Sequence, residues 1–206
     1  MNYKIIKEQE RKEFDRFYRA NLINGLSGAK PLNLIASISD DNETNVALFN
    51  SVTHIGANPA LVSFIQRPLT EYSHTIKNIQ QNGFYTINQV HESFYKQAHQ
   101  TSAKYKREES EFNYCELNEE YIQGFKAPFV KESLIKYAVE CVKIVSIDEN
   151  DTKIVIGAIK DIVVHEDLLK KSGHLDLVKA NTVAGGGLDQ YYTIDFLNTL
   201  PYAKRI

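Results

Sequence analysis

Hydrophobic positions along this chain fall into short runs that alternate with polar positions and are separated by turn-forming residues. In residues 31–39 every second position is apolar, which is the period of a strand with one buried face. These apolar positions are Leu32, Leu34, Ala36 and Ile38. The turn-forming residues 40–42 then lead into a second strand-like run, residues 45–53. The pattern predicts an antiparallel hairpin.

Four more runs have the character of strands. Residues 60–66 and 84–90 are short and apolar, with turn-forming residues before each of them. Residues 134–147 and 153–165 are longer and rich in β-branched side chains, which favour strands. A polar, turn-like segment joins the two long runs, so they are predicted to form a second antiparallel hairpin.

Helical spacing occurs in two places. Residues 13–22 carry one apolar stripe, made of Phe14, Phe17, Tyr18 and Leu22. A second helix is predicted from residue 73 to the Asn82–Gly83 pair, a sequence that often ends helices. Residues 92–123 are polar and are predicted to form an excursion from the core. Residues 185–187 are three consecutive glycines, predicted to form a flexible loop or an anion-binding nest.

Short antiparallel strands with few helices predict a mainly β fold, a Greek-key or barrel-like core with peripheral helices. The length of 206 residues fits a single domain spanning residues 1–206, large enough to bury a substantial core. We therefore expect one β-barrel domain.

Composition narrows the function classes. Charged residues make up 24% of the chain and the formal net charge is -2, so we expect no nucleic-acid partner. Cys115 and Cys141 lie far apart and the histidines lack metal-ligand spacing, so we expect no metal site. The first 12 residues do not resemble a signal peptide, and no apolar run approaches the length of a membrane span. We expect a cytoplasmic protein that does not engage membranes.

The strongest candidate for anion binding is Arg67, which directly follows a predicted strand and precedes a predicted helix. Unpaired amide groups at a helix start favour a phosphate, and Ser73, His74 or Thr75 could add a side-chain donor. The alternative for Arg67 is an ordinary surface arginine. The alternative for Ser73 and Thr75 is simple capping of the helix, which is compatible with phosphate binding.

The order of these motifs resembles the flavin reductase-like FMN-binding split-barrel family over roughly residues 14–195. The resemblance rests on residues 31–39 and 45–53, on residues 61–65 with Arg67, and on residues 73–79 and 84–88. The chain departs from the family pattern at Leu48, where many members have proline, and at Ala184, where many carry a basic residue. The fold that the resemblance implies is an FMN-binding split barrel of Greek-key type.

The resemblance also implies a set of cofactor-binding residues. The strand edge from Phe49 through Asn50, Ser51 and Val52 to Thr53 would run along the pyrimidine side of FMN. Asn45 and Asn88 match family asparagines, and each could bond a flavin carbonyl or hold a turn. Arg67, Ser73, His74 and Thr75 would address the phosphate. The residue 92–112 excursion and the glycine run around Gly186 would border the reaction face.

The resemblance implies a reductase that passes a hydride from NADH or NADPH to the N5 atom of FMN. We expect a homodimer with FMN near the subunit interface, because burying both faces of a flat ring most simply uses a second subunit. No catalytic acid or base is expected, because the cofactor carries the chemistry. Two alternatives stay open: a split-barrel oxidase that uses bound FMN on another substrate, and a non-catalytic FMN storage or sensor protein.

Overall fold

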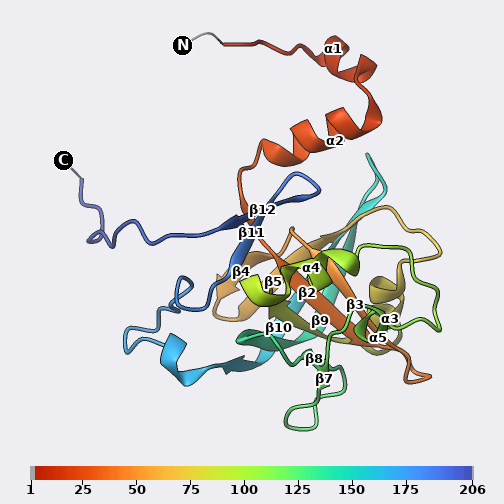
Figure 1. Cartoon of the computed structure of the whole chain (residues 1–206), viewed down its shortest axis with the longest axis vertical. Helices are drawn as coiled ribbons and strands as arrows, with labels where there is room; N and C mark the ends of the chain where they lie inside the picture. Colours follow the sequence, from red (N-terminus) through yellow and green to blue (C-terminus); the bar gives the residue numbers. More distant parts are fainter. Residues whose placement is uncertain (1–2, 206) are drawn as a thin grey trace.

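The computed structural model describes residues 3–205, and a seven-stranded antiparallel sheet dominates it (Figure 1). The strand order in this sheet is β3-β2-β6-β9-β10-β5-β4. The strands are β2 Asn33–Ile38, β3 Thr44–Phe49, β4 Thr53–Ala57, β5 Ala60–Gln66, β6 Phe84–Gln89, β9 Ile135–Ile147 and β10 Thr152–Val164. The predicted mainly β fold class is confirmed, and both predicted hairpins are present.

The two edge strands of this sheet, β3 and β4, are consecutive in the chain. Only residues 50–52 join them, so the sheet must curl until its two edges approach each other. The ring of Phe49 at the end of β3 packs edge-on against Phe64 of β5, with 5.0 Å between ring centroids. The predicted single strand over residues 45–53 is therefore wrong, because the chain turns at Asn50 to cross from one edge to the other.

Strand β2 is buried on both faces. Leu34 and Ala36 belong to one hydrophobic cluster together with Phe112, and Ile35 belongs to a second cluster together with Phe64. The alternating positions predicted for this strand share one face, as expected. The opposite face is covered as well, which explains why Ile35 is fully buried.

Gly185 and Gly186 lie in a strand, which corrects the prediction of a loop for these two residues, whereas Gly187 begins the turn that follows, with φ 64°. A three-stranded sheet has the order β1-β11-β12, with β1 Lys30–Pro31, β11 Val183–Gly186 and β12 Gln190–Thr193. A Cβ atom on Gly185 would lie 2.8 Å from Cδ2 of Leu32, and one on Gly186 would lie 2.7 Å from Cε2 of Tyr192. The glycines thus allow two neighbouring side chains to pack directly on the backbone of β11.

The predicted helix after Arg67 is α3 His74–Asn82, which ends at Gly83 with φ 81°. Its buried face includes Ile76 and Ile79. The polar excursion contains short elements: η1 Glu92–Phe94, α4 Tyr95–Gln100, α5 Glu111–Tyr114, β7 Glu119–Glu120 and β8 Phe129–Val130. The 3-10 helix η2 Glu166–Leu168 follows β10.

The N-terminal helices extend away from the main sheet (Figure 1). They are α1 Glu8–Glu13 and α2 Arg16–Gly25, whereas the sequence predicted one helix over residues 13–22. Asp15 separates them, because its carboxylate accepts hydrogen bonds from the amides of Phe17 and Tyr18 and so begins α2. The apolar stripe covers no core in this chain: Phe17 is 67% exposed and Tyr18 is 52% exposed.

Two kinds of feature are absent from the part of the chain that the structure describes. Within residues 3–205, no helix is long and apolar enough to cross a membrane. The same residues contain no group of three or more histidine, cysteine, aspartate or glutamate side chains placed to hold a metal ion.

Candidate functional site

A pocket of about 560 Å³ opens where β3, β5, the start of α3, the 101–105 segment and the β11–β12 hairpin meet. We call it the main pocket. Residues from all five segments line it, among them Asn45, Phe49, Asn50, Ser51, Arg67, Tyr72, Ser73, Thr75, Thr101, Ser102, Lys104, Tyr105, Glu111, Gly186 and Tyr191. Small-molecule and cofactor sites commonly have volumes of about 300–1,000 Å³, so a ligand of nucleotide size fits here.

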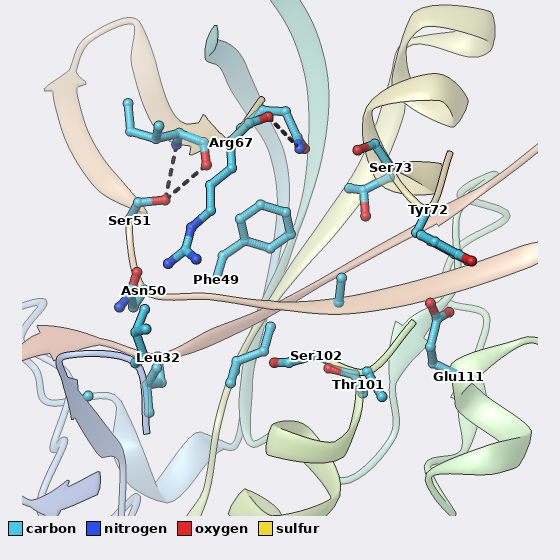
Figure 2. Close-up of a pocket in the computed structure, with 18 of the residues that line it drawn as sticks. Leu32, Phe49, Asn50, Ser51, Arg67, Tyr72, Ser73, Thr101, Ser102 and Glu111 are labelled. Carbon is cyan, nitrogen blue, oxygen red and sulfur yellow. Dashed lines mark hydrogen bonds between the residues drawn. The ribbon is translucent and has the colours of Figure 1, made fainter. Parts of the chain in front are cut away.

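Residues 50–52 connect β3 to β4 and so cross between the two edges of the sheet; we call them the crossing. Asn50 and Ser51 of the crossing line one wall of the main pocket (Figure 2). The hydroxyl of Ser51 accepts a hydrogen bond from the amide of Ile65 at 3.1 Å and donates one to the carbonyl of the same residue at 3.3 Å. The side-chain amide of Asn50 donates to the carbonyl of Gly187 at 3.4 Å. The crossing is thus fastened to β5 on one side and to the glycine hairpin on the other.

Arg67 leaves the end of β5 and points toward the crossing at Asn50 and Phe49 (Figure 2). Among residues 3–205 Arg67 takes part in a side-chain hydrogen bond only through its carbonyl, which accepts from Nε2 of Gln66 at 3.1 Å, and its guanidinium is in none of the ion pairs. Five N–H donors in a fixed fork are therefore available on the pocket side. This arrangement suits an anionic or carbonyl-bearing ligand.

The start of α3 forms the opposite side of the main pocket. No side chain caps this helix, because the hydroxyl of Ser73 instead accepts from the amide of Thr70 at 2.9 Å. The hydroxyl of Thr75 accepts from the side-chain amide of Asn45 at 2.9 Å, and both residues are buried. An uncapped helix start with hydroxyl groups beside it can receive an anion.

Four residues that the sequence assigned to the cofactor lie outside the lining of the main pocket. Val52 packs against the hydrophobic cluster around Phe64, and Thr53 is exposed on β4. His74 is buried, with its Nε2 atom 3.2 Å from the carbonyl oxygen of Tyr105. The remaining one, Asn88, belongs to the core.

Asn88 holds three strands together. Its side-chain amide donates to the carbonyl of Leu34 and to the hydroxyl of Thr86, and its oxygen accepts from the amide of Val130 at 2.9 Å. The residue is fully buried, so all of these bonds form away from solvent. The sequence left open a bond to a flavin carbonyl or the holding of a turn for Asn88, and its side-chain bonds instead join β2, β6 and β8.

The sequence did not single out several residues of the main pocket. The 101–105 segment and Glu111 belong to the polar excursion. The sequence predicted that residues 92–112 border the reaction face but named no side chain among them. Tyr191 follows the glycine run, and its hydroxyl lies 2.6 Å from Nδ1 of His99. Burial raises the pKa of Glu111 to about 7, against the opposing effect of amide hydrogen bonds. Because the polar excursion has no hydrophobic periodicity, nothing in the sequence indicated that its side chains line a pocket.

A second pocket of about 640 Å³ lies between α2 and the β11–β12 hairpin. It shares Gly186, Gly187 and Gln190 with the main pocket, so the glycine hairpin is a common wall. The exposed rings of Tyr18 and Tyr192 also line it. Helix α2 therefore lies beside the glycine hairpin that also lines the main pocket.

Known proteins resemble this chain both in sequence and in fold. The sequence profile of the family described as flavin reductase like domain matches residues 27–182. The chain is similar to a candidate flavin reductase with a split barrel domain from Shewanella frigidimarina, at 45% identity and a TM-score of 0.94. That match covers 98% of this chain and 100% of the other.

Two further solved structures share the fold at low identity. Nitrilotriacetate monooxygenase component B from Bacillus cereus is 19% identical, with a TM-score of 0.86 over 97% of this chain and 100% of its own. The 2-nitrobenzoate 2-nitroreductase of Pseudomonas fluorescens is 18% identical, with a TM-score of 0.80 over 97% of each chain. These matches extend over the N-terminal helices as well as the barrel, which confirms the split-barrel architecture.

Proposed function

Because this chain belongs to the flavin reductase-like family, we propose that it binds FMN in the main pocket and reduces flavin with NADH or NADPH. Family membership makes it a flavin-related oxidoreductase. The identity of the flavin as FMN and of the donor as a nicotinamide nucleotide is the proposal.

One observation carries the proposal: a guanidinium without a partner among residues 3–205 and an uncapped helix start border one pocket. Arg67 points into the main pocket, and Ser73 and Thr75 stand at the start of α3 on its other side. A phosphorylated, carbonyl-bearing ring system supplies acceptors for both. A neutral apolar ligand would leave these donors unsatisfied, at a cost of about 1–3 kcal/mol for each one desolvated.

The crossing at residues 50–52 would orient the ring. Residues 50–52 belong to neither β3 nor β4, so their backbone N–H and C=O groups lie outside the sheet ladder and can bond the acceptors and donors on the pyrimidine edge of a flavin. Ser51 uses its hydroxyl to bind Ile65 and Asn50 uses its amide to bind Gly187, so both side chains fix the backbone in place. The role proposed for this segment is therefore positioning through the backbone.

Bound FMN would supply the hydride acceptor and the onward electron donor. The chain has to bind it, hold its orientation and leave one face accessible to the nicotinamide. The glycine hairpin is placed for that last task, because Gly185, Gly186 and Gly187 all lie in the lining of the main pocket. No acid or base of the protein is assigned a catalytic role.

We also propose a homodimer with the cofactor near the interface. Large apolar side chains are exposed on α2 and on the segment after β12, among them Phe17, Tyr18, Phe196, Leu197 and Tyr202. Phe196 is 68% exposed and Leu197 is 97% exposed. A second copy would bury such side chains, and the second pocket beside α2 would place that contact next to the site.

Two other functions remain as competing candidates. In the first, the protein is a split-barrel oxidase whose bound FMN acts on another substrate; the 2-nitrobenzoate 2-nitroreductase that shares the fold is named for a substrate of its own. In the second, the protein stores or senses FMN without turnover. Both alternatives use the FMN site that we propose. They differ from the reductase in whether a nicotinamide nucleotide reduces the flavin and in whether the flavin dissociates from the protein.

Steady-state oxidation of NADH and NADPH by the purified protein, with FMN, riboflavin or no added flavin, tests the proposal. We expect turnover that depends on added flavin, with FMN the better substrate. The absorption spectrum of the protein before flavin addition separates a fixed cofactor from an exchangeable one. Binding of FMN without oxidation of either nucleotide would favour storage or sensing and would contradict the reductase.

A further inference from the structure

Glu111 is a buried carboxyl group in the wall of the main pocket. It is the first residue of α5, only 6% of it is exposed, and among the described residues 3–205 it is the one acidic residue in the pocket lining. Figure 2 shows it on the side where Tyr72 and Ser73 lie, away from Asn50. An acid at the phosphate side of a proposed FMN site needs an explanation, because two negative charges would repel each other there.

The contacts of Glu111 tie it to the same strand as the proposed phosphate site. Its Oε2 atom accepts from the amide of Val46 at 3.2 Å. The preceding residue of β3, Asn45, donates to Thr75 at the start of α3. Glu111 and Thr75 thus form hydrogen bonds with two consecutive residues of β3, and both line the main pocket.

No basic side chain makes an ion pair with Glu111 among the described residues 3–205. The charged groups nearby are Arg107 on the preceding loop, which favours the ionised form, and Lys104, which lines the pocket. On the other elements packed here, His74 begins α3, and β3 contributes only uncharged residues at Asn45 and Val46. Tyr105 and Cys115 are further titratable neighbours, and Tyr72 lies on the same side of the pocket. The carboxyl group is therefore not neutralised by a salt bridge.

We propose that Glu111 meets the phosphate of FMN as a neutral carboxylic acid, so that FMN binds together with one proton. The proposal rests on the function proposed above and adds a specificity element to it. The Oε2 atom keeps the bond from Val46, and the protonated carboxyl donates its O–H to a phosphate oxygen. The proton comes from solvent, and no covalent bond other than the O–H bond changes.

The titration of Glu111 supports this role. Burial raises its pKa to about 7, while amide hydrogen bonds and Arg107 lower it, so both forms are present at neutral pH. A phosphate dianion brought beside it raises the pKa of Glu111 further, because like charges disfavour ionisation. Binding of a phosphorylated ligand then draws a proton onto this side chain.

The expected signature is a pH dependence that FMN shows and riboflavin does not. Above pH 7 the neutral form of Glu111 becomes scarce, so the Kd for FMN rises on the order of tenfold between pH 7 and pH 8.5. The phosphate of FMN also titrates, with a second pKa near 6 for phosphomonoesters, which contributes little in this range. Glu111→Gln, always neutral and able to keep the bond to Val46, should bind FMN with a Kd that changes less than threefold over the same range.

Isothermal titration calorimetry of the full chain with FMN, at pH 7.5 in buffers of different ionisation enthalpy, measures proton uptake directly. Wild type should take up roughly 0.5–0.8 proton at this site, and Glu111→Gln should lose that uptake. Glu108→Gln removes a charge from an exposed residue of the same loop and should behave as wild type. His74→Gln should also retain the uptake, which separates Glu111 from the nearby imidazole.

Three results would overturn the proposal. The first is equal proton uptake in wild type and Glu111→Gln, and the second is pH-independent FMN binding by wild type. The third is the same linkage with riboflavin, which would move Glu111 away from the phosphate. No FMN binding at any pH would remove the proposed function and this inference together, whereas tight FMN binding without proton uptake would remove this inference alone.

Discussion

The hydroxyl of Ser51 binds both the amide and the carbonyl of Ile65, and so joins the crossing between the sheet edges to β5. We expect Ser51→Ala to lower the free energy of unfolding by about 1–3 kcal/mol, because two backbone groups lose their partner. FMN affinity should fall as well, since the crossing would be less ordered. Urea unfolding monitors the first effect. Ser102→Ala, in the same pocket and without such a tie, is the control, and equal stability of both variants would contradict the role of Ser51.

Arg67→Ala should weaken FMN binding by about 10- to 150-fold, because a charge-assisted hydrogen bond contributes roughly 1.5–3 kcal/mol. Riboflavin binding should hardly change if the guanidinium addresses the phosphate. Titration calorimetry with both ligands measures this, and Lys143→Ala on β9, outside the pocket lining, controls for the loss of a positive charge. An equal loss for both ligands would move Arg67 from the phosphate to the ring.

Gly186→Val should slow flavin reduction by NADH or NADPH while leaving FMN affinity within a few fold. The new Cβ would meet the ring of Tyr192, whose Cε2 atom lies 2.7 Å from that position, and push it or the hairpin aside. Stopped-flow bleaching of the oxidised flavin gives the rate. In a Tyr192→Ala background the same substitution should cost less, and an unchanged rate in the single variant would show that the hairpin does not border the reaction face.

Light scattering should give the mass of a dimer at micromolar protein concentration. Phe17→Asp places a charge on the exposed stripe of α2 and should shift the protein toward monomer. Glu10→Lys on α1 changes the charge of the same N-terminal region at a polar residue and should not. A monomeric wild type with FMN bound would exclude a site shared between subunits.

The contribution of Glu111 to the stability of the ligand-free protein should fall as pH rises from about 4.5 to about 7, whereas the lowered pKa of buried His74 acts in the opposite direction. Glu111 has a folded pKa of about 7, above its ordinary value of 4.5, so its contribution is complete below pH 4.5 and is lost as pH rises through 7. The difference corresponds to roughly 2–4 kcal/mol. Denaturant unfolding across this range should show a flatter profile for Glu111→Gln; parallel profiles would mean that Glu111 titrates normally.

The sequence correctly predicted elements that depend on residues close together in the chain. β5 spans the predicted residues 60–66, and the long β9–β10 hairpin arises from two β-branched runs around one turn. Resemblance to a family added what periodicity cannot supply, the expectation that Asn50, Ser51 and Arg67 share one site. All three line the main pocket.

What the sequence missed depends on distant contacts. The turn at Asn50 is set by the closing of the sheet, and the strand character of Gly185 and Gly186 is set by Leu32 and Tyr192 packing on them. Glu111 has the sequence context of an ordinary exposed acid until the backbone of β3 is placed over it. Asn88 matched a family asparagine, yet its bonds to three strands keep it in the core.

The position of β4 at the sheet edge also affects how the protein behaves in a crowded solution. A regular edge strand presents a row of unpaired backbone groups on which another chain can add, and this is a common start of aggregation. The pairing of β4 with β5 shifts register between His54 and Gly56, and such bulges twist an edge away from a flat template. This irregularity therefore makes β4 a poor template for the addition of another chain.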